Sequence, residues 1–289
     1  MKIAVFTKLY NHIHENTLNN LIQFLSAQNI ETSVYSSAES HILQDGITFF
    51  NSSEELISLN PDFVFSLGGD GTLLDSILLI RDSKIPVLGI NTGRLGFLAN
   101  NQMNQLDQII ASLRQKQYNI EERTLVELQS HPDLFNKENY ALNEFTIHKG
   151  DSSSLVKITV VVNQELFNTY WCDGLILSTP TGSTAYSMSC GGPIVFPQSN
   201  TFILTPVAPH NLNVRPVILP DDAEFSFTIS GRNRKYLISL DSRYRTIDDS
   251  VQLSARKAPF KIFTIRFNNQ NFSKVIREKL NWGLDQRNT

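Results

Sequence analysis

The chain has 289 residues, 41% of them apolar, and carries a formal net charge of -3. This length suits one large or two ordinary domains with a substantial core. Apolar stretches such as residues 158–162 are far shorter than the roughly 18 to 20 residues of a membrane-spanning helix, and the first residues lack a secretory apolar core. Cys172 and Cys190 suggest neither a disulfide framework nor a zinc site. We therefore expect a cytoplasmic protein with reduced thiols and no membrane partner.

The charge is unevenly distributed along the chain. Residues 231–289 hold 13 Lys and Arg against 5 Asp and Glu, and the rest holds 12 against 23. A basic segment can bind nucleic acid, but these charges are scattered among strand-like positions. The pattern favours a solvated or subunit-facing surface, and we expect no nucleic-acid partner.

The first 115 or so residues alternate short apolar strands with helical stretches. Strands are expected over residues 2–7, 32–36, 62–67 and 87–90, and helices over 72–80 and 105–113. An apolar stripe at Leu18, Leu21, Ile22 and Leu25 has the i, i+3, i+4, i+7 spacing of another helix. This order predicts a parallel sheet with helices, as in a Rossmann-like α/β domain.

From about residue 121 the apolar period changes to alternation, which is typical of strands. The stretches 124–128, 154–162, 224–229, 236–240 and 261–267 all have this pattern. We therefore predict α/β plus all-β: an α/β domain over residues 1–118, and a β-rich, sandwich-like domain over residues 119–270. A terminal helix over 271–289 is expected to pack back on the first domain.

The first chemical signal is the run Gly68, Gly69, Asp70, Gly71 and Thr72, where a buried strand ends and a helix begins. Glycines let the backbone approach a ligand closely, and the amide groups of the following helix attract phosphate oxygens. A carboxylate repels phosphate, so Asp70 suggests another task, either accepting a proton from a hydroxyl or holding magnesium. A simple strand-to-helix turn capped by Asp70 is the alternative.

Two further motifs follow strand-like runs. Residues 91–98 place a second glycine turn at the same predicted sheet edge, where neighbouring strand ends line a ligand crevice. Asn143 and Glu144 interrupt the alternation of residues 140–147, and an amide beside a carboxylate can bind an adenine edge and ribose hydroxyls. An ordinary turn and an exposed loop, respectively, are the alternatives.

The longest motif covers residues 173–189 and closes with Gly191, Gly192 and Pro193. Asp173 opens it, a strand follows, and the strand ends in a run of hydroxyl side chains that offers hydrogen bonds without adding charge. Tyr186 is suited to pack on a base or a sugar. A serine nucleophile is the competing interpretation, but the Gly-x-Ser-x-Gly elbow is missing.

Several familiar sites do not occur in this sequence. It contains no Gly-x-x-x-x-Gly-Lys-Ser/Thr loop, no Gly-x-Gly-x-x-Gly fingerprint, no His-Glu-x-x-His helix and no calcium loop. The six His residues are dispersed, and His148 and His210 are interpreted as polar surface or structural residues. We therefore expect no protein-built metal site.

Taken in order, the four motifs resemble the motif set of the NAD kinase family. The first motif alone is shared with diacylglycerol, sphingosine and phosphofructokinase-like kinases, whereas the four together are specific to NAD kinases. The resemblance covers most of the chain. It implies an α/β domain, a β-sandwich-like domain, an active site between them, and assembly into a homodimer or homotetramer.

The resemblance also implies roles for particular residues. Asp70 would be the catalytic base, with Gly68, Gly69, Gly71 and Thr72 as the phosphate loop and a magnesium ion accompanying ATP. Asp70 would also bind NAD, together with Gly71, Asn143, Glu144, Asp173, Thr184, Ala185, Tyr186, Ser187, Met188, Ser189 and Ala208. Asp241 and Arg243 would belong to the same pocket, contributed by the neighbouring subunit.

Two positions depart from the family pattern. Asp75 stands where relatives often carry a basic residue or His, and Arg243 stands where many have a neutral amide. These departures bear on affinity and donor preference. The function predicted from the sequence is transfer of the terminal phosphoryl group of ATP to the adenosine ribose 2′-hydroxyl of NAD.

Two other functions remain open from the sequence. A lipid kinase of the diacylglycerol or sphingosine type would share the Asp70 loop but needs a membrane-facing patch, and no amphipathic basic helix is evident. A non-catalytic dinucleotide sensor would bind NAD without needing Asp70 in a phosphate turn. Assays with NAD and lipid substrates separate the three.

Overall fold

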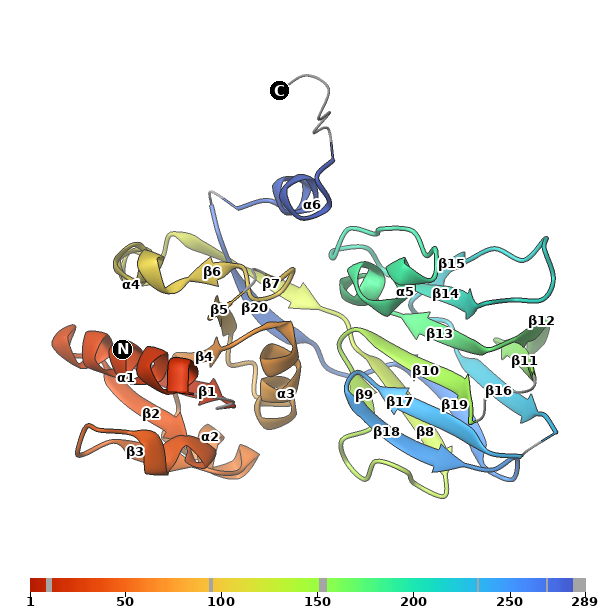
Figure 1. The fold of residues 1–289 in the computed structure, drawn as a ribbon, viewed down its shortest axis with the longest axis horizontal. Coiled ribbons are helices and arrows are strands. Elements are labelled where there is room, and N and C mark those ends of the chain that lie inside the picture. The colour runs from red at the N-terminus through yellow and green to blue at the C-terminus, as the bar shows by residue number, and fades with distance from the viewer. Residues whose placement is uncertain (9–11, 94–95, 151–154, 233, 269, 283–289) are drawn as a thin grey trace. The chain divides into compact units, whose positions relative to one another are not determined.

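The computed structural model describes residues 1–8, 12–93, 96–150, 155–232, 234–268 and 270–282. The chain divides into two compact units, one formed by residues 1–122 and 262–289 and the other by residues 123–261 (Figure 1). Within the described residues, no helix is both long and apolar enough to cross a membrane.

The first unit is built on an eight-stranded sheet with the order β3-β2-β1-β4-β5-β20-β7, and β6 pairs with β5. The described strand registers from β3 to β20 are parallel, as are those of β5 with β6. Its strands are β1 (Lys2–Thr7), β2 (Glu31–Tyr35), β3 (Thr48–Phe50), β4 (Phe63–Leu67), β5 (Val87–Asn91), β6 (Asn101–Gln102), β7 (Tyr118–Arg123) and β20 (Ile262–Phe267).

Helices alternate with these strands, as the sequence predicts. They are α1 (His12–Ala27), α2 (Ser53–Leu59), α3 (Asp70–Ile80), α4 (Leu106–Arg114) and α6 (Phe272–Leu280), with 3-10 turns at η1 (Ser36–His41) and η2 (Met103–Gln105). The predicted stripe on α1 is fully buried, because Leu18, Leu21, Ile22 and Leu25 are at most 1% exposed. They pack in one apolar cluster with residues of β1, β4 and β5.

The second unit is an antiparallel sandwich of two six-stranded sheets, ordered β15-β14-β13-β10-β17-β18 and β12-β11-β16-β19-β8-β9 (Figure 1). Alternate residues of both sheets point inward and form one apolar core. Its strands are β8 (Val126–His131), β9 (Tyr140–Ala141), β10 (Glu144–Lys149), β11 (Val156–Val162), β12 (Glu165–Cys172), β13 (Gly174–Ser178), β14 (Thr201–Val207), β15 (Val217–Pro220), β16 (Phe225–Ser230), β17 (Tyr236–Leu240), β18 (Arg243–Ile247) and β19 (Gln252–Lys257). The short helices are η3 (Thr181–Thr184) and α5 (Tyr186–Ser189).

These two units confirm the predicted fold class. Both cysteines are free thiols, and burial raises the pKa of Cys172 to about 12. The unit boundaries differ from the expected ones at residues 118 and 270, because β7 and β20 belong to the first sheet. Alternation of apolar residues identifies β20 as a strand, but it does not say which sheet the strand joins.

Candidate functional site

Asp70 is the first residue of α3, directly after the buried strand β4. Gly69 is the N-cap of the helix in an extended conformation, and its carbonyl oxygen accepts from the amides of Thr72 and Leu73. Gly68 donates from its amide to the Ile90 carbonyl, at 2.9 Å. The predicted strand-to-helix turn therefore exists, and a hydrogen bond to β5 holds it in place.

The Asp70 carboxylate is held by three consecutive backbone amides. Its Oδ2 accepts from the amide of Phe97 at 2.8 Å, and its Oδ1 accepts from Leu98 at 3.1 Å and from Ala99 at 2.8 Å. A Cβ atom on Gly96 would lie 1.8 Å from Asp70 Oδ1, so only glycine permits this approach. The structure thus brings the first two sequence motifs together. Arg94 and Leu95, in the middle of the second motif, lie outside the described residues.

The third and fourth motifs meet in the second unit. Asn143 and Glu144 are both buried, where the chain enters β10. The Thr179 hydroxyl donates to the Leu142 carbonyl at 2.5 Å, and the Thr179 amide donates to the Asn143 carbonyl at 2.9 Å. A Cβ on Gly182 would lie 2.1 Å from the Asn143 carbonyl oxygen, so this glycine lets the hydroxyl-rich loop pack closely on Asn143.

Glu144 is a strongly perturbed acid of this site. Burial raises its pKa to about 8, the negative charge of Asp241 adds to that shift, and a hydrogen bond from the Tyr186 backbone opposes it. Among the described residues, Glu144 Oε2 has no hydrogen-bond partner. A carboxyl with this pKa is mostly protonated at pH 7, so it can donate a hydrogen bond to a ligand.

Asp241 lies beneath the same turn. Its Oδ2 accepts from the Leu142 amide at 2.8 Å, and its Oδ1 accepts from Asn143 at 2.8 Å and from Glu144 at 3.1 Å. Burial raises the pKa of Asp241, while the three amides and Arg243 oppose that shift. Within this chain, Asp241 therefore supports the turn that carries Asn143 and Glu144. The predicted contribution from a neighbouring subunit stays a prediction.

Asp173 and Tyr186 flank this turn. Asp173 pairs with Lys149, whose Nζ lies 2.6 Å from Asp173 Oδ1. The ring of Tyr186 stacks on His148, with centroids 5.5 Å apart, and Tyr186 is 38% exposed. Burial lowers the pKa of His148, and the Asp173 charge opposes this shift. The sequence did not single out Lys149, since a lysine ending a strand carries no distinguishing pattern.

The other predicted pocket residues lie in the hydroxyl-rich loop, which includes η3 and α5, or directly after β14. Ser187 is buried, and its hydroxyl shares a 2.8 Å hydrogen bond with Thr205, so it holds the loop in place. Ala208 is exposed with a positive φ of 44°, directly after the β14 residue that pairs with Gly174. Thr184 ends η3, Ala185 links it to α5, and Met188 and Ser189 lie in α5 beside Tyr186.

Both departures from the family pattern make contacts of their own. Asp75, on α3, pairs with Lys8 at 2.6 Å. The Arg243 guanidinium donates to the carbonyl oxygens of Glu138 and Tyr140, which fixes it against the backbone of its own unit.

Comparisons with known proteins identify the relatives of this chain. A family model described as the ATP-NAD kinase N-terminal domain matches residues 4–118, and one described as the ATP-NAD kinase C-terminal domain matches residues 142–267. A curated relative from Cytophaga hutchinsonii, named NAD kinase, is 46% identical over 275 residues, which is 94% of each chain. Another NAD kinase, from Flavobacterium psychrophilum, is 42% identical over the whole of both chains.

Two solved structures share the fold. The yeast NADH kinase complexed with NADH matches with a TM-score of 0.86 at 22% identity, covering 100% of this chain and 89% of that one. An NAD kinase from Archaeoglobus fulgidus in complex with ATP matches with a TM-score of 0.74 at 23% identity, covering 98% of this chain and all of that one. At these identities the likeness concerns the fold alone.

Proposed function

This chain belongs to the NAD kinase family, and we propose that it transfers the terminal phosphoryl group of ATP to the adenosine ribose 2′-hydroxyl of NAD, which yields NADP. The observation that carries the proposal is the anchored Asp70 carboxylate at the start of α3, in a chain that also has the family's other three motifs. A strand-to-helix glycine turn suits phosphates, and a fixed carboxylate there suits a hydroxyl nucleophile.

In the proposed reaction, Asp70 accepts the proton of the 2′-hydroxyl. The freed oxygen forms a bond to the terminal phosphorus, the bond from that phosphorus to the bridging oxygen breaks, and ADP leaves with the electron pair. Asp70 Oδ2 accepts a hydrogen bond from a single described amide, that of Phe97, so a lone pair of this oxygen remains free to take the substrate proton. Most of the rate acceleration in phosphoryl transfer comes from positioning and charge stabilisation.

The second unit supplies the proposed dinucleotide-binding residues. Asn143 and a protonated Glu144 would hydrogen-bond the nucleotide, and the half-exposed Tyr186 ring would pack on it. Asp173, already paired with Lys149, would contact the base. Residues 184–189 and Ala208 complete this proposed pocket. The raised pKa makes Glu144 a hydrogen-bond donor, where a carboxylate would only accept.

Magnesium enters this proposal with the nucleotide. Among the described residues, no group of three or more His, Cys, Asp or Glu side chains lies close enough together to hold a metal ion. Magnesium commonly binds through substrate phosphates with few protein ligands, so the ATP phosphates would carry it. When bound, it neutralises charge on the phosphate chain. We further propose a cytoplasmic enzyme of NADP biosynthesis that assembles as a homodimer or homotetramer, as family membership suggests.

The test is incubation of the purified protein with NAD, ATP and magnesium, followed by an NADP-specific dehydrogenase assay. We expect NADP from the wild type, and a loss of about 10² to 10⁴-fold in turnover for Asp70→Asn, the range of general-base assistance. Retention of most turnover by Asp70→Asn would remove Asp70 as the base.

Two other outcomes would overturn the kinase proposal itself. Phosphorylation of diacylglycerol or sphingosine, with no NADP formed, would establish a lipid kinase. Binding of NAD without turnover in the presence of magnesium and ATP would establish a dinucleotide sensor.

A further inference from the structure

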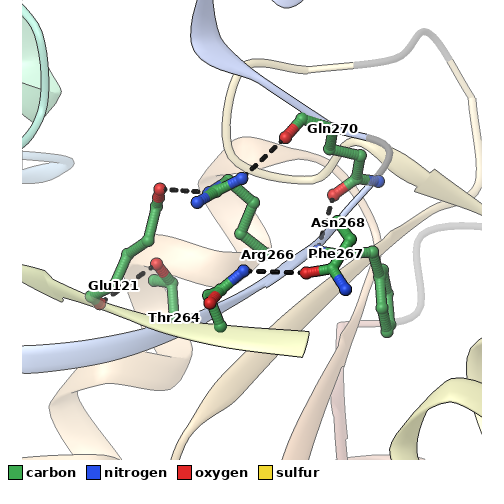
Figure 2. A network of polar contacts seen from close by, with 7 residues as sticks. Glu121, Thr264, Arg266, Phe267, Asn268 and Gln270 are labelled. Atoms are coloured by element: carbon green, nitrogen blue, oxygen red, sulfur yellow. Dashed lines mark hydrogen bonds and ion pairs between the residues drawn. The ribbon is translucent and has the colours of Figure 1, made fainter. Parts of the chain in front are cut away.

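The carboxyl-terminal segment rejoins the first unit through a dense polar network (Figure 2). Strand β20 carries Arg266, whose Nε donates to Glu121 Oε1 at 2.6 Å, and the Glu121 side chain is only 10% exposed. The Thr264 hydroxyl donates to the Glu121 carbonyl at 3.4 Å. Arg266 Nη1 also donates to the Gln270 carbonyl at 2.8 Å, which ties the end of the strand to the turn before α6.

Gln270 carries this network to the segment that follows the Asp70-binding amides. Its Oε1 accepts from the Phe267 amide at 3.4 Å (Figure 2). Its Nε2 donates to Asn101 Oδ1 at 2.9 Å. Asn101 Nδ2 in turn donates to the Gly89 carbonyl of β5 at 3.0 Å. The turn is therefore attached to the central sheet, and α6 starts immediately after it.

A pocket of about 180 Å³ lies between α6 and the segment after the Asp70-binding amides. Its lining is dominated by side-chain amides, among them Asn100 and Gln270. It also includes two lysines, Lys274 and Lys279, and one acid, Glu278. Lys274 forms a loose pair with Glu278, at 3.8 Å. Among the described residues, Lys279 has no ion-pair partner within salt-bridge distance, so its charge is available to an anion.

The pocket borders the segment that binds the Asp70 carboxylate. Asn100 lines it, and the preceding residue, Ala99, donates its amide to Asp70 Oδ1 at 2.8 Å. Burial lowers the pKa of Lys279, and the negative charges of Asp70 and then Glu278 oppose the shift, which places Lys279 within electrostatic range of Asp70. A cation, several amides and an anchored carboxylate thus occur together in one unit.

We propose that this pocket binds the phosphate chain of the phosphoryl donor, and that Lys279 supplies the positive charge that holds the chain beside Asp70. The proposal rests on the proposed function, because it needs a phosphoryl donor at Asp70. As the bond from the terminal phosphorus to the bridging oxygen breaks, negative charge grows on the departing chain, and a nearby ammonium stabilises it. Lys279 transfers no proton in this step.

The same chemistry fits a nucleoside triphosphate or inorganic polyphosphate, since only the phosphate chain is recognised. The experiment measures KM for magnesium-ATP, with NAD saturating, in the wild type, Lys279→Gln, Lys279→Arg and Arg277→Gln. Arg277 is the matched control, because it lies exposed on the same helix and does not line the pocket. Polyphosphate replaces ATP in a parallel series, and calorimetry measures the Kd of inorganic tripolyphosphate for each variant.

We expect Lys279→Gln to raise KM for ATP and Kd for tripolyphosphate about tenfold, the low end for a charge-assisted contact that is partly exposed. Lys279→Arg should stay within about threefold of the wild type, because it keeps the charge. Arg277→Gln should match the wild type, and KM for NAD should not change in any variant. Thermal denaturation checks that all variants fold.

Equal KM and Kd values for Lys279→Gln and Arg277→Gln would overturn the proposal while leaving the kinase function intact. A folded wild type that makes no NADP would overturn the kinase function instead, and tripolyphosphate binding that depends on Lys279 would still support the pocket. If NADP forms with ATP but not with polyphosphate, the donor is a nucleoside triphosphate. If NADP forms with either donor, the phosphate chain is the part that is recognised. Either result supports the proposal only if Lys279→Gln raises KM for the donor.

Discussion

Asp70 in the first unit and Asp241 in the second use the same backbone arrangement. Each carboxylate accepts from three consecutive amides, with one oxygen taking two of them and the other taking one. The amides belong to residues 97–99 for Asp70 and to residues 142–144 for Asp241. In both cases an aspartate fixes a turn that is distant in the sequence.

The surroundings of the two carboxylates differ. Asp70 lies within electrostatic range of the cation of Lys279. Asp241 is desolvated beside a second acid, Glu144, and its negative charge helps to raise the Glu144 pKa to about 8. The same three-amide turn therefore holds a carboxylate for the proposed chemistry in one unit and supports a neighbouring protonated acid in the other.

Among the changes that test this comparison, the largest expected effect comes from disturbing the Asp70 turn without changing Asp70 itself. In Gly96→Ala, the new Cβ would lie 1.8 Å from Asp70 Oδ1, so either the carboxylate or the loop must move. We expect kcat to fall about 100-fold, since a displacement of about 1 Å in a positioned group can cost that much. Steady-state NADP formation measures it.

Gly93→Ala is the matched control for this substitution. It lies in the same segment, and its added Cβ would meet no described atom within 4 Å. Equal activity of the two alanine variants would mean that the three-amide anchor of Asp70 does not matter for turnover. Asp70→Asn removes the proton acceptor and also one oxygen of the anchor. Gly96→Ala disturbs the anchor but keeps the carboxylate, so it separates the anchor from the proton-accepting role.

The corresponding change in the second unit, Asp241→Ala, should act on stability. It leaves three amides without their acceptor, at about 1 to 3 kcal/mol for each buried unsatisfied donor, and relief of repulsion with Glu144 offsets part of this. We expect a loss of about 3 kcal/mol in the free energy of unfolding. Urea titration followed by Trp171 fluorescence, with Trp282→Phe in both proteins, reports the second unit.

Asp248→Ala provides the comparison for that experiment. Asp248 is exposed and accepts from the amide and hydroxyl of Ser250, so its loss should shift the urea midpoint much less. Equal midpoints for the two variants would contradict a supporting role for Asp241.

The most gradual expected effect is a pH dependence that arises from Glu144. Its folded-state pKa of about 8 lies above its ordinary value of 4.5. Between these values the folded protein keeps a proton that the unfolded chain has released, so the free energy of unfolding falls as pH rises. The slope is at most about 1.4 kcal/mol per pH unit for one group. Glu144→Gln should flatten this decline between pH 5 and 8.

Urea titrations across this pH range measure the slope, and Glu165→Gln is the control, because Glu165 is exposed on β12 of the same unit. Asp241 is present in all three proteins, so its own contribution to the pH dependence remains in each. Parallel curves for the wild type and Glu144→Gln would show that Glu144 is not protonated in the folded protein.

The sequence by itself determined the local features of this protein. The glycine turn before α3 follows from residues adjacent in the chain, and the buried stripe on α1 follows from helical spacing. The change from helical to alternating periods predicted an α/β unit followed by a β unit. The order of four motifs indicated the family without any knowledge of contacts.

Only the tertiary structure decided how these pieces meet. Asp70 contacts amides 27 to 29 residues away, and Asp241 contacts amides 97 to 99 residues away. The return of β20 and α6 to the first unit, which brings Lys279 toward Asp70, crosses the expected domain boundary. Such contacts depend on sheet membership, register and burial. Period-two alternation encodes which face of a strand is buried but not which strand lies beside it.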